Sequence, residues 1–400
     1  MGKEILIISN YFPPEQGAAA NRIQALANEL KRRSYKVAVI CPLPNYPKGK
    51  VFPGFKGKLS HKEQNGNLTI HRLWLLASNS QNKFVRLFSM LSFAFSLSLF
   101  LLFKKSPKKV IIQCSPLFVG YAGVFFSKLK GKKVILNVSD LWPLAGLEME
   151  LLNQGTYYTI LEKIERFNYK KSDLVLGQSH EILRYVNQIF PEKKTVLYRN
   201  YPDFDIPESN SHFTSALHRA GLPSVTNSKE IKIVYAGLLG IAQGLYEICK
   251  QIALPANISL HIYGEGPEAK QIEDLSVKNS QIVFHGMIDR TELHQVLGNY
   301  DMTLVPLANR IYGSVPSKIF EYSRLGLPIL YFSEGEGAEL VKKHQLGWSI
   351  SDFEKLNVFL SQLSKNEILL PERAAIITTV KEKFNFKKQF DEIIQVIESC

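Results

Sequence analysis

The segment SVPSKIFEYSRLGLPILYF, residues 314–332, places a cation and a carboxylate three positions apart, at Lys318 and Glu321. Residues three apart share one face of a helix. A lysine ammonium supplies a point charge for a phosphate, and a carboxylate can accept hydrogen bonds from both hydroxyls of a ribose. The alternative is a solvated intrahelical pair, worth roughly 0.2–0.5 kcal/mol. The segment alone leaves both interpretations open.

The ends of this predicted helix are marked by the sequence. Pro316 suits the first helical position, with Ser314 or Val315 as the preceding cap, and Gly326 suits the end. The unpaired N–H groups of a first turn attract anions. We therefore expect an anion site where the strand MTLVPL, residues 302–307, runs into this segment.

Three glycine-containing turns follow predicted strands in the same half of the chain. They are YAGLLGIAQGL (235–245), IYGEGPE (262–268) and HGMID (285–289). Glycine lets backbone N–H groups approach a pyrophosphate closely. One such turn is weak support, because turns need glycine anyway, but three at the ends of strands in one sheet indicate a nucleotide-binding crevice.

Two stretches of the first half carry further candidates. NYFPPEQGAAANR (10–22) is a turn from strand to helix whose Gly17 lets a ligand approach the backbone, unless it is a simple turn. NVSDLWPL (137–144) places Asp140 after a strand, where it suits either a sugar hydroxyl or acceptor deprotonation, or else a helix cap. The basic loop NYPKGKVFPGFKGK (45–58) is placed to cover an acceptor.

The elements that position these residues read as an α/β protein. Continuous Val and Ile runs predict strands buried on both faces, as in a parallel sheet. They lie at 4–10, 36–42, 109–115 and 133–139 in the first half, with a helix at 20–34, and at 231–237, 258–264, 281–286, 302–307 and 328–332 in the second. We predict two Rossmann-like, doubly wound domains.

The domain boundary falls in a polar stretch rich in Pro, Ser and Asn. We predict an N-terminal domain over residues 1–199, a linker over 200–230 and a C-terminal domain over 231–379. A last helix at 380–400 is expected to pack back on the first domain.

Charge is divided unevenly between the halves. Residues 1–200 hold 30 Lys and Arg against 12 Asp and Glu, and residues 201–400 hold 19 against 24. The first half should therefore attract an anionic membrane surface or a lipid-linked pyrophosphate. No motif typical of nucleic-acid binding occurs, so we expect no nucleic-acid partner. Four scattered cysteines without a CxxC predict neither a metal site nor a disulfide framework.

The stretch LFSMLSFAFSLSLFLLF, residues 87–103, has 17 residues without a charge. Lysines follow it, and Arg86 precedes it. Three interpretations stay open: a helix lying on a membrane surface, a core helix, or a true span, although a span prefers about 20 apolar residues. The flanking cations favour the first interpretation.

Taken together, these motifs resemble the family 4 retaining glycosyltransferases of the GT-B fold, in the branch that builds capsule and O-antigen. The resemblance rests on YFPPEQG, PNYPKG, DLWP, YAGLLGIAQGL, YGEGPE, HG with DRTEL, and VPSKIFEYSRLGLPIL, and it spans residues 5 to about 348. It implies two domains facing a cleft. It also implies transfer of a hexosyl or amino-sugar unit from a nucleotide-diphosphate sugar to a lipid-linked, polyprenyl-diphosphate acceptor, with retention and without a cofactor or metal.

The resemblance also implies roles for particular residues. Glu321 is similar to the ribose-binding carboxylate, Lys318 and the 314–317 backbone to the diphosphate ligands, and Asp140 to the acceptor-side acid. The candidate catalytic residues are Asp140, Lys318 and Glu321. The candidate donor-binding residues are Gly17, Gly237, Gln243, Gly264, Gly266, Met287, Ser314, Val315, Pro316, Ser317, Lys318 and Glu321. The enzyme would be cytoplasmic, on the inner face of the cell membrane.

The chain departs from the family pattern at three positions. Gly313 stands where many members have a second glutamate, and Leu238 and Gln243 stand where many have Arg and Lys. These departures leave two alternatives open: a sugar-nucleotide epimerase of the same fold, or a subunit that binds a nucleotide sugar without catalysis.

Overall fold

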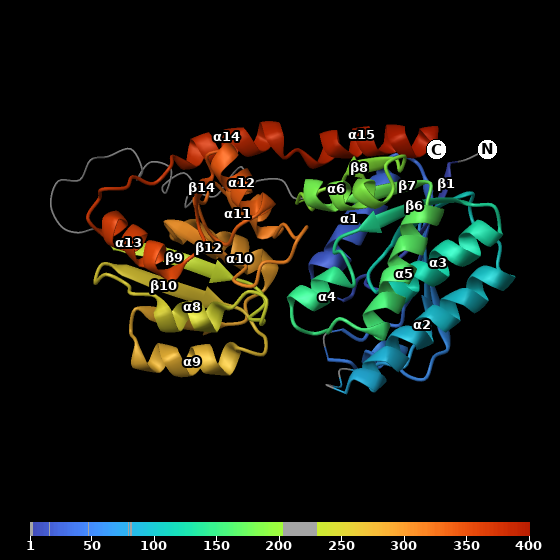
Figure 1. Ribbon diagram of the computed structural model, residues 1–400, viewed down its shortest axis with the longest axis horizontal. Helices are drawn as coiled ribbons and strands as arrows, with labels where there is room; N and C mark the ends of the chain where they lie inside the picture. The colour runs from blue at the N-terminus through green and yellow to red at the C-terminus, as the bar shows by residue number, and fades with distance from the viewer. Residues whose placement is uncertain (1–2, 16, 47, 79, 81, 203–229) are drawn as a thin grey trace. The chain divides into compact units, whose positions relative to one another are not determined.

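The computed structural model describes residues 3–15, 17–46, 48–78, 80, 82–202 and 230–400. The chain forms two compact units (Figure 1): unit 1 lies within residues 1–200 and 390–400, and unit 2 within 201–389. Most of the predicted linker, residues 203–229, lies outside the described residues.

Unit 1 contains an eight-stranded sheet in the order β3-β4-β2-β1-β5-β6-β7-β8. All neighbours are parallel except β3 and β4. The strands are β1 (Glu4–Ile8), β2 (Lys36–Pro42), β3 (Ser60–Asn65), β4 (Leu68–Leu73), β5 (Lys109–Gln113), β6 (Lys133–Val138), β7 (Leu174–Gly177) and β8 (Thr195–Leu197). Residues of β1 such as Ile5, Ile7 and Ile8 are fully buried, because helices cover both faces of the sheet.

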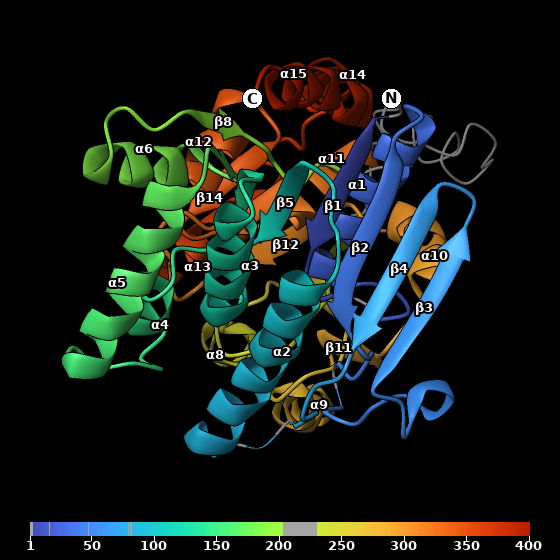
Figure 2. The same ribbon diagram turned by 90° about the vertical axis from the view of Figure 1, so that its right-hand side faces the viewer.

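Helix α3 packs between α2 and α5, and the three helices cover one face of this sheet (Figure 2). The helices of unit 1 are α1 (Ala18–Arg32), α2 (Lys83–Phe103), α3 (Leu117–Leu129), α4 (Leu144–Glu148), α5 (Thr156–Lys171), α6 (His180–Ile189) and the short η1 (Pro53–Phe55). The helix α15 (Phe386–Ser399) joins them from the end of the chain, since residues 390–400 group with unit 1.

Unit 2 contains a six-stranded parallel sheet in the order β11-β10-β9-β12-β13-β14. Its strands are β9 (Ile231–Ala236), β10 (Ile258–Tyr263), β11 (Ile282–Gly286), β12 (Met302–Pro306), β13 (Ile329–Phe332) and β14 (Gly347–Ile350). Counted from β9 as strand 1, this order is 3-2-1-4-5-6, which is the order in dinucleotide-binding sheets. The strand order reverses between β9 and β12. A buried apolar cluster lies on each face.

The helices of unit 2 complete the doubly wound arrangement. They are α8 (Leu245–Gln251), α9 (Ala269–Lys278), α10 (Arg290–Val296), α11 (Lys318–Arg324), α12 (Glu336–Lys343), α13 (Phe353–Ser364), α14 (Arg373–Lys383) and the short η2 (Leu297–Asn299). The predicted fold class, α/β with two Rossmann-like domains, is confirmed.

The predicted strands match to within one or two residues, but several elements were missed. Strands β3, β4, β7, β8 and β14 were not predicted, and part of the basic 45–58 loop is the turn η1. The predicted helix 380–400 is two helices, since α14 ends at Lys383 and residues 380–389 group with unit 2.

The predicted start of α11 was wrong by two residues. The first helical residue is Lys318 and the cap is Ser317. The N–H of Ile319 donates to the carbonyl of Pro316 at 3.1 Å, a bond one residue shorter than an α-helical one. Pro316 therefore belongs to a tight turn ahead of the helix. The predicted end is right, since Gly326 has a positive φ of 74° directly after the C-cap residue.

The apolar segment 87–103 forms most of α2, and one face of the helix is core. Phe93 and Leu97 are fully buried, and Leu101 is nearly so. Among the described residues, no helix is long and apolar enough to cross a membrane. The spanning interpretation is therefore wrong, and the core interpretation accounts for one face only.

Candidate functional site

Several predicted donor-binding residues of unit 2 lie at the point where the order of its strands reverses, between β9 and β12. Ala236 is the last residue of β9, between β10 on one side and β12 on the other. Open α/β sheets bind ligands at the carboxyl ends of the strands beside such a point. The glycine turns after β9 and β10 and the start of α11 all lie at this edge.

Lys318 reaches the end of β9 directly. Its Nζ donates hydrogen bonds to the carbonyl of Ala236 and, at 3.1 Å, to the hydroxyl of Tyr322. The Tyr322 hydroxyl also donates to the Ala236 carbonyl. The ammonium lies 5.5 Å from the ring centre of Tyr235 and 5.3 Å from that of Tyr322. A positive charge is thus held against the strand end by two aromatic rings.

The glycine turns after β9 and β10 pack against each other through their backbones, next to the Lys318 ammonium. Gly237 and Gly264 have φ values of 155° and 152°, which side chains rarely adopt. A Cβ on Gly237 would collide with Nζ of Lys318, and a Cβ on Gly264 with the carbonyl of Gly237. Gly266 lies against the carbonyl of Leu239 in the same way. The structure therefore brings Gly237, Gly264, Gly266 and Lys318 together.

Glu321 is held by a histidine that was not predicted from the sequence as a site residue. Nε2 of His294, on α10, lies 3.0 Å from Oε1 of Glu321, and both side chains are more than four-fifths buried. His294 lies in the ordinary polar helix RTELHQV, so no spacing signals this pair. A buried carboxylate whose position is fixed by a partner can present an oxygen to a ligand in a set orientation.

The remaining donor candidates of unit 2 are more scattered. The Oε1 atom of Gln243 is buried and, among the described residues, has no hydrogen-bond partner. An unsatisfied buried acceptor costs free energy unless a ligand or water supplies a donor. Val315 is core, whereas Met287 is 64 % exposed. Ser314 donates its backbone N–H to the carbonyl of Ile311, and Pro316 and Ser317 form the turn before α11.

Asp140 lies in unit 1 just beyond β6, at the carboxyl edge of that sheet. The helix-cap interpretation is wrong, because α4 begins at Leu144 with Pro143 as its cap. Burial raises the pKa of the Asp140 carboxyl, and the positive charge of Arg22 opposes that rise. Arg22 thus favours the ionised form of Asp140, which is the form needed to take a proton or to accept a hydrogen bond from a sugar hydroxyl.

Arg22 was not identified from the sequence. It is 5 % exposed, and its Nη2 donates to Oδ1 of Asn137 at 2.8 Å and to the carbonyl of Tyr198 at 2.7 Å. Its Nε and Nη1 atoms are buried and have no partner among the described residues. These two nitrogens of the buried guanidinium can donate hydrogen bonds to an anionic ligand or to the carboxylate of Asp140.

Asn137 links Arg22 to a series of side-chain hydrogen bonds that reaches Ser139, the residue before Asp140. Its Nδ2 donates to Oε1 of Gln113 at 2.7 Å, and Nε2 of Gln113 donates to the hydroxyl of Ser139 at 2.9 Å. Gln178 donates to the carbonyl of Ser139 from β7's end. The loop that carries Asp140 is therefore fixed by strands on both sides.

Gly17 caps α1 at the end of the first strand-to-helix turn, with a φ of 133°. The neighbouring Glu15 is almost fully buried, and its Oε1 accepts backbone N–H groups of Asn45 at 2.8 Å and Tyr46 at 2.9 Å. The YFPPEQG and PNYPKG motifs, far apart in the sequence, are therefore joined through one carboxylate. Burial raises the pKa of Glu15, and these N–H groups oppose that rise.

The described residues contain no group of three or more His, Cys, Asp or Glu side chains arranged for a metal ion. Cys41, Cys114 and Cys249 are buried as free thiols.

Comparisons with known proteins agree on one family. Residues 17–200 match the family model described as "Glycosyl transferase 4-like domain", and residues 230–366 match "Glycosyl transferases group 1". No sequence among the curated proteins matches the chain significantly.

Several solved structures are similar over nearly the whole chain. Sucrose-phosphate synthase from Thermosynechococcus elongatus is 13 % identical with a TM-score of 0.73, covering 99 % of this chain and 98 % of that one. Anabaena Alr3699/HepE in complex with UDP and glucose is 14 % identical with a TM-score of 0.68, covering 100 % of both.

WaaG, a glycosyltransferase involved in lipopolysaccharide biosynthesis, is 12 % identical with a TM-score of 0.64, covering 98 % of this chain and 99 % of that one. At such identities the likeness concerns the fold, and the family follows from the two sequence models, which between them cover most of both units. The chain belongs to the glycosyltransferases of the GT-B fold.

Proposed function

We propose that this glycosyltransferase moves a hexosyl or amino-sugar unit from a nucleotide-diphosphate sugar to a lipid-linked oligosaccharide, with retention, in capsule or O-antigen synthesis. The observation that best supports a nucleotide-diphosphate donor is the position of the Lys318 ammonium, which lies against the end of β9 beside Gly237. The HepE structures with UDP and with UDP-glucose support a donor of this class.

The chemistry follows from the charge that develops when the donor breaks. Cleavage of the glycosidic bond leaves a nucleoside diphosphate, whose growing negative charge must be stabilised. Lys318 would exchange its Ala236 contact for a phosphate oxygen. Of the 314–317 backbone, the N–H groups of Val315 and Ser317 would donate to the phosphates, because Pro316 has no N–H and that of Ser314 is bonded to Ile311. Leu238 and Gln243 stand where many members of the family have Arg and Lys. Lys318 would therefore supply a larger part of the positive charge that stabilises the leaving diphosphate.

We assign the remaining contacts by unit. Glu321, held by His294, would accept hydrogen bonds from the ribose of the donor. Asp140 would receive the acceptor's hydroxyl proton, with Arg22 favouring its ionised state. Retention by attack on the same face requires no enzyme nucleophile, and we nominate none. Gly17 would leave room beside the reacting carbon.

The lipid-linked acceptor is supported by the charge and surface of unit 1. Residues 1–200 have 18 more cationic than anionic side chains, which suits a polyprenyl diphosphate and an anionic leaflet. We therefore place the protein in the cytoplasm, bound to the inner face of the cell membrane.

Lys318→Ala tests the donor half of this proposal. We expect turnover with a panel of sugar nucleotides to fall by about 100-fold, since one preorganised donor to a developing charge is worth this much. The fold should persist, because Tyr322 still donates to the Ala236 carbonyl. The measurement is radiolabelled sugar transfer to a lipid-linked acceptor, with melting temperature as the folding check.

Lys342→Ala, at an exposed lysine near the end of α12, is the matched control and should transfer sugar normally. Near-normal transfer by Lys318→Ala would refute the leaving-group role. Release of an epimerised free sugar without any acceptor would instead support the epimerase alternative.

A further inference from the structure

Helix α2 is apolar on two opposite faces, and only one of them is used by unit 1. The buried face carries Phe93, Leu97 and Leu101. The exposed face carries Phe84, Phe88, Leu91, Phe95, Leu99 and Leu102 at spacings of three and four, from 37 to 73 % exposed. A surface helix normally has one apolar face and one polar face. The second apolar face therefore indicates a second, apolar environment.

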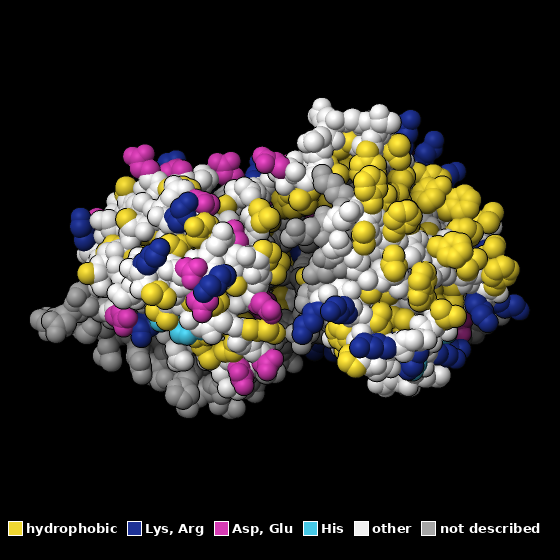
Figure 3. Space-filling view, turned by 90° about the horizontal axis from the view of Figure 1, so that it is seen from below, with side chains coloured by type: hydrophobic (Ala, Val, Ile, Leu, Met, Phe, Trp, Pro, Cys, Tyr) yellow, Lys and Arg dark blue, Asp and Glu magenta, His cyan; other side chains and the backbone are white. Residues whose placement is uncertain are grey.

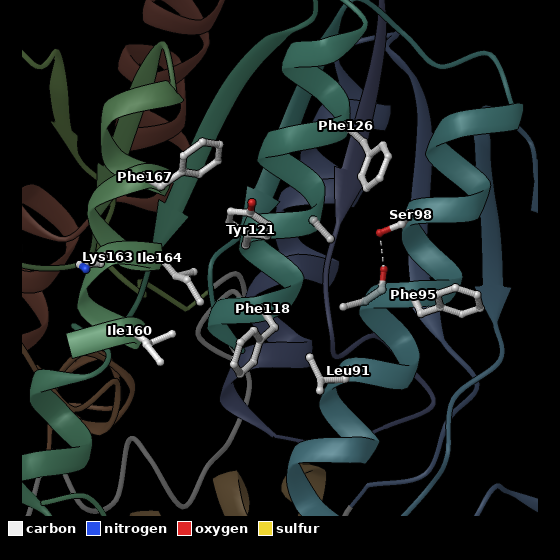
Figure 4. A pocket seen from close by; sticks show the side chains of 12 residues that line it. Leu91, Phe95, Ser98, Phe118, Tyr121, Phe126, Ile160, Lys163, Ile164 and Phe167 are labelled. Atoms are coloured by element: carbon white, nitrogen blue, oxygen red, sulfur yellow. Dashed lines mark hydrogen bonds between the residues drawn. The ribbon is translucent and has the colours of Figure 1, made fainter. Parts of the chain in front are cut away.

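Three of the four serines of α2 have their hydroxyls bonded within the helix. The hydroxyls of Ser92, Ser96 and Ser98 donate to carbonyls one turn earlier, at 2.7 to 3.1 Å (Figure 4 shows Ser98). Hydroxyls bonded to their own helix can enter an apolar medium without losing a hydrogen bond.

Neighbouring helices extend the exposed apolar face. Tyr121, Phe125 and Leu129 on α3 and Tyr157 and Ile160 on α5 are also exposed. Of the large apolar side chains exposed among the described residues, twelve of 23 lie on these three helices. Figure 3 shows the corresponding field of hydrophobic side chains over unit 1. Apolar surface gathered in this way marks an interaction site.

Between the three helices runs an apolar groove of about 610 Å³. Leu91 of α2, Phe118 of α3 and Ile160 and Ile164 of α5 project into it (Figure 4). Lys163 of α5 is the one charged residue among those that line the groove. The apolar walls of the groove suit a hydrocarbon chain.

Cations converge at one end of this face, where α2 and α3 finish. Nζ of Lys130 donates to the carbonyl of Lys104 at 3.1 Å, and Nζ of Lys132 donates to that of Ser106 at 2.7 Å. Lys104, Lys105 and Lys130 are exposed beside the exposed Phe103 and Leu129. The sequence between Glu63 and Asp140 contains no acidic residue, so no carboxylate of α2 or α3 offsets this charge.

We propose that the exposed face of α2, α3 and α5 docks on an anionic lipid bilayer and that the groove takes up one hydrocarbon chain of the lipid. Aromatic and aliphatic side chains next to lysines match the acyl boundary and the head groups of such a surface. A second copy of this chain is disfavoured as the occupant, because two lysine-edged faces would repel each other. The inference rests on the proposed function for its purpose, namely presenting a lipid-linked acceptor to unit 1.

Docking is measured with plain vesicles, without donor or acceptor, so its failure is distinct from failure of transfer. We expect the full chain to co-sediment with phosphatidylglycerol-containing vesicles more strongly than with phosphatidylcholine vesicles. The double variant Phe88→Ser/Phe95→Ser should bind at least about tenfold more weakly, since both rings leave the bilayer. Val277→Ser/Leu369→Ser, at the most exposed large apolar side chains among the described residues of unit 2, should bind as wild type.

Lysine variants test the head-group contact separately. Lys104→Gln/Lys105→Gln should weaken binding to anionic vesicles by roughly fivefold per lysine and leave the weak binding to neutral vesicles unchanged. Lys342→Gln/Lys343→Gln, an exposed pair on α12, is the matched control and should have no effect. Melting temperature and circular dichroism check the fold of each variant.

The proposal is overturned if the wild type fails to bind vesicles of either composition, or if the phenylalanine variant binds as wild type. It is also overturned if sedimentation velocity shows a dimer in lipid-free solution that Phe88→Ser/Phe95→Ser converts to a monomer. That result would assign the face to a second copy.

Discussion

At the scale of single residues, the site depends on charges whose partners come from distant parts of the chain. Lys318 is held by a carbonyl 82 positions earlier, and Glu321 by a histidine 27 positions earlier. Such partners fix where each charge points, and a preorganised charge costs no reorganisation when the reaction occurs.

Glu321→Gln tests the assignment of this carboxylate to the ribose. Hydrogen bonds to a charged acceptor are worth about 1.5–3 kcal/mol, so we expect the donor KM to rise roughly tenfold or more. The same variant should lose less affinity for the 2′-deoxy form of the donor, which keeps only the 3′-hydroxyl of the pair. Steady-state kinetics with both forms measure the difference.

The outcome that would contradict the ribose role is an equal loss with both forms of the donor. That result would mean that Glu321 stabilises the fold of α11 through His294 instead.

At the scale of elements, helix α5 carries a carboxyl whose ionisation opposes folding. Glu165 is fully buried, and it accepts hydrogen bonds from the hydroxyls of Tyr169 at 2.9 Å and Tyr185 at 3.1 Å. Burial raises the pKa of Glu165 to about 8, and the two tyrosine bonds oppose this only in part. The native state therefore holds a proton that the unfolded chain releases near its ordinary pKa.

This pKa difference predicts a loss of stability as pH rises. Because the folded pKa is raised, the contribution is fully present below about pH 4.5 and declines until about pH 8. Glu165→Gln cannot ionise, so at pH 9 it should be more stable than wild type by roughly 5 kcal/mol, since each unit of pKa shift is worth about 1.4 kcal/mol, and similar at pH 4. Urea unfolding at both pH values measures this change.

Glu162→Gln, on the same helix and paired with Arg166 at 3.0 Å, is the control and should reduce the pH dependence only slightly, because the charge of Glu162 is a minor cause of the raised pKa of Glu165. If Glu165→Gln unfolds with the same pH dependence as wild type, Glu165 is already ionised in the native state.

At the scale of the whole molecule, the chain finishes in the unit where it began. Phe390, Ile393 and Ile397 of α15 are fully buried. Arg33 pairs with Asp391 at 2.5 Å, and the hydroxyl of Tyr35 donates to Oε1 of Glu398 at 2.6 Å. The stability of unit 1 therefore depends on residues that follow all of unit 2 in the sequence.

Phe390→Ala should destabilise unit 1 by about 3–5 kcal/mol, as expected when a buried aromatic ring is removed. Hydrogen exchange followed by mass spectrometry should show faster exchange in β1 and β5 and unchanged exchange in β9 and β12. Leu369→Ala, at an 81 % exposed position, should change neither. Equal acceleration in both units would contradict the assignment of α15 to unit 1.

How much of the fold the sequence predicted depended on the kind of element. Strands such as EILII and KVILNV are continuous apolar runs, so their place in a parallel sheet follows from burial on both faces. The hairpin strand SHKEQN is polar at the sheet edge, and GWSI is short, so neither carries a pattern that stands out from a loop. Most of the missed strands lie towards the edges of the sheets for this reason.

Local burial patterns and backbone freedom were enough to predict the two α/β units, the glycine turns, and Lys318 and Asp140 as candidates from the amino-acid sequence. The contact of Lys318 with Ala236, the pairing of His294 with Glu321, the charge of Arg22 near Asp140 and the exposed apolar face of α2 are seen only in the folded chain. The physical reason is that hydrogen bonds and charge pairs across a fold join residues with no fixed spacing along the chain.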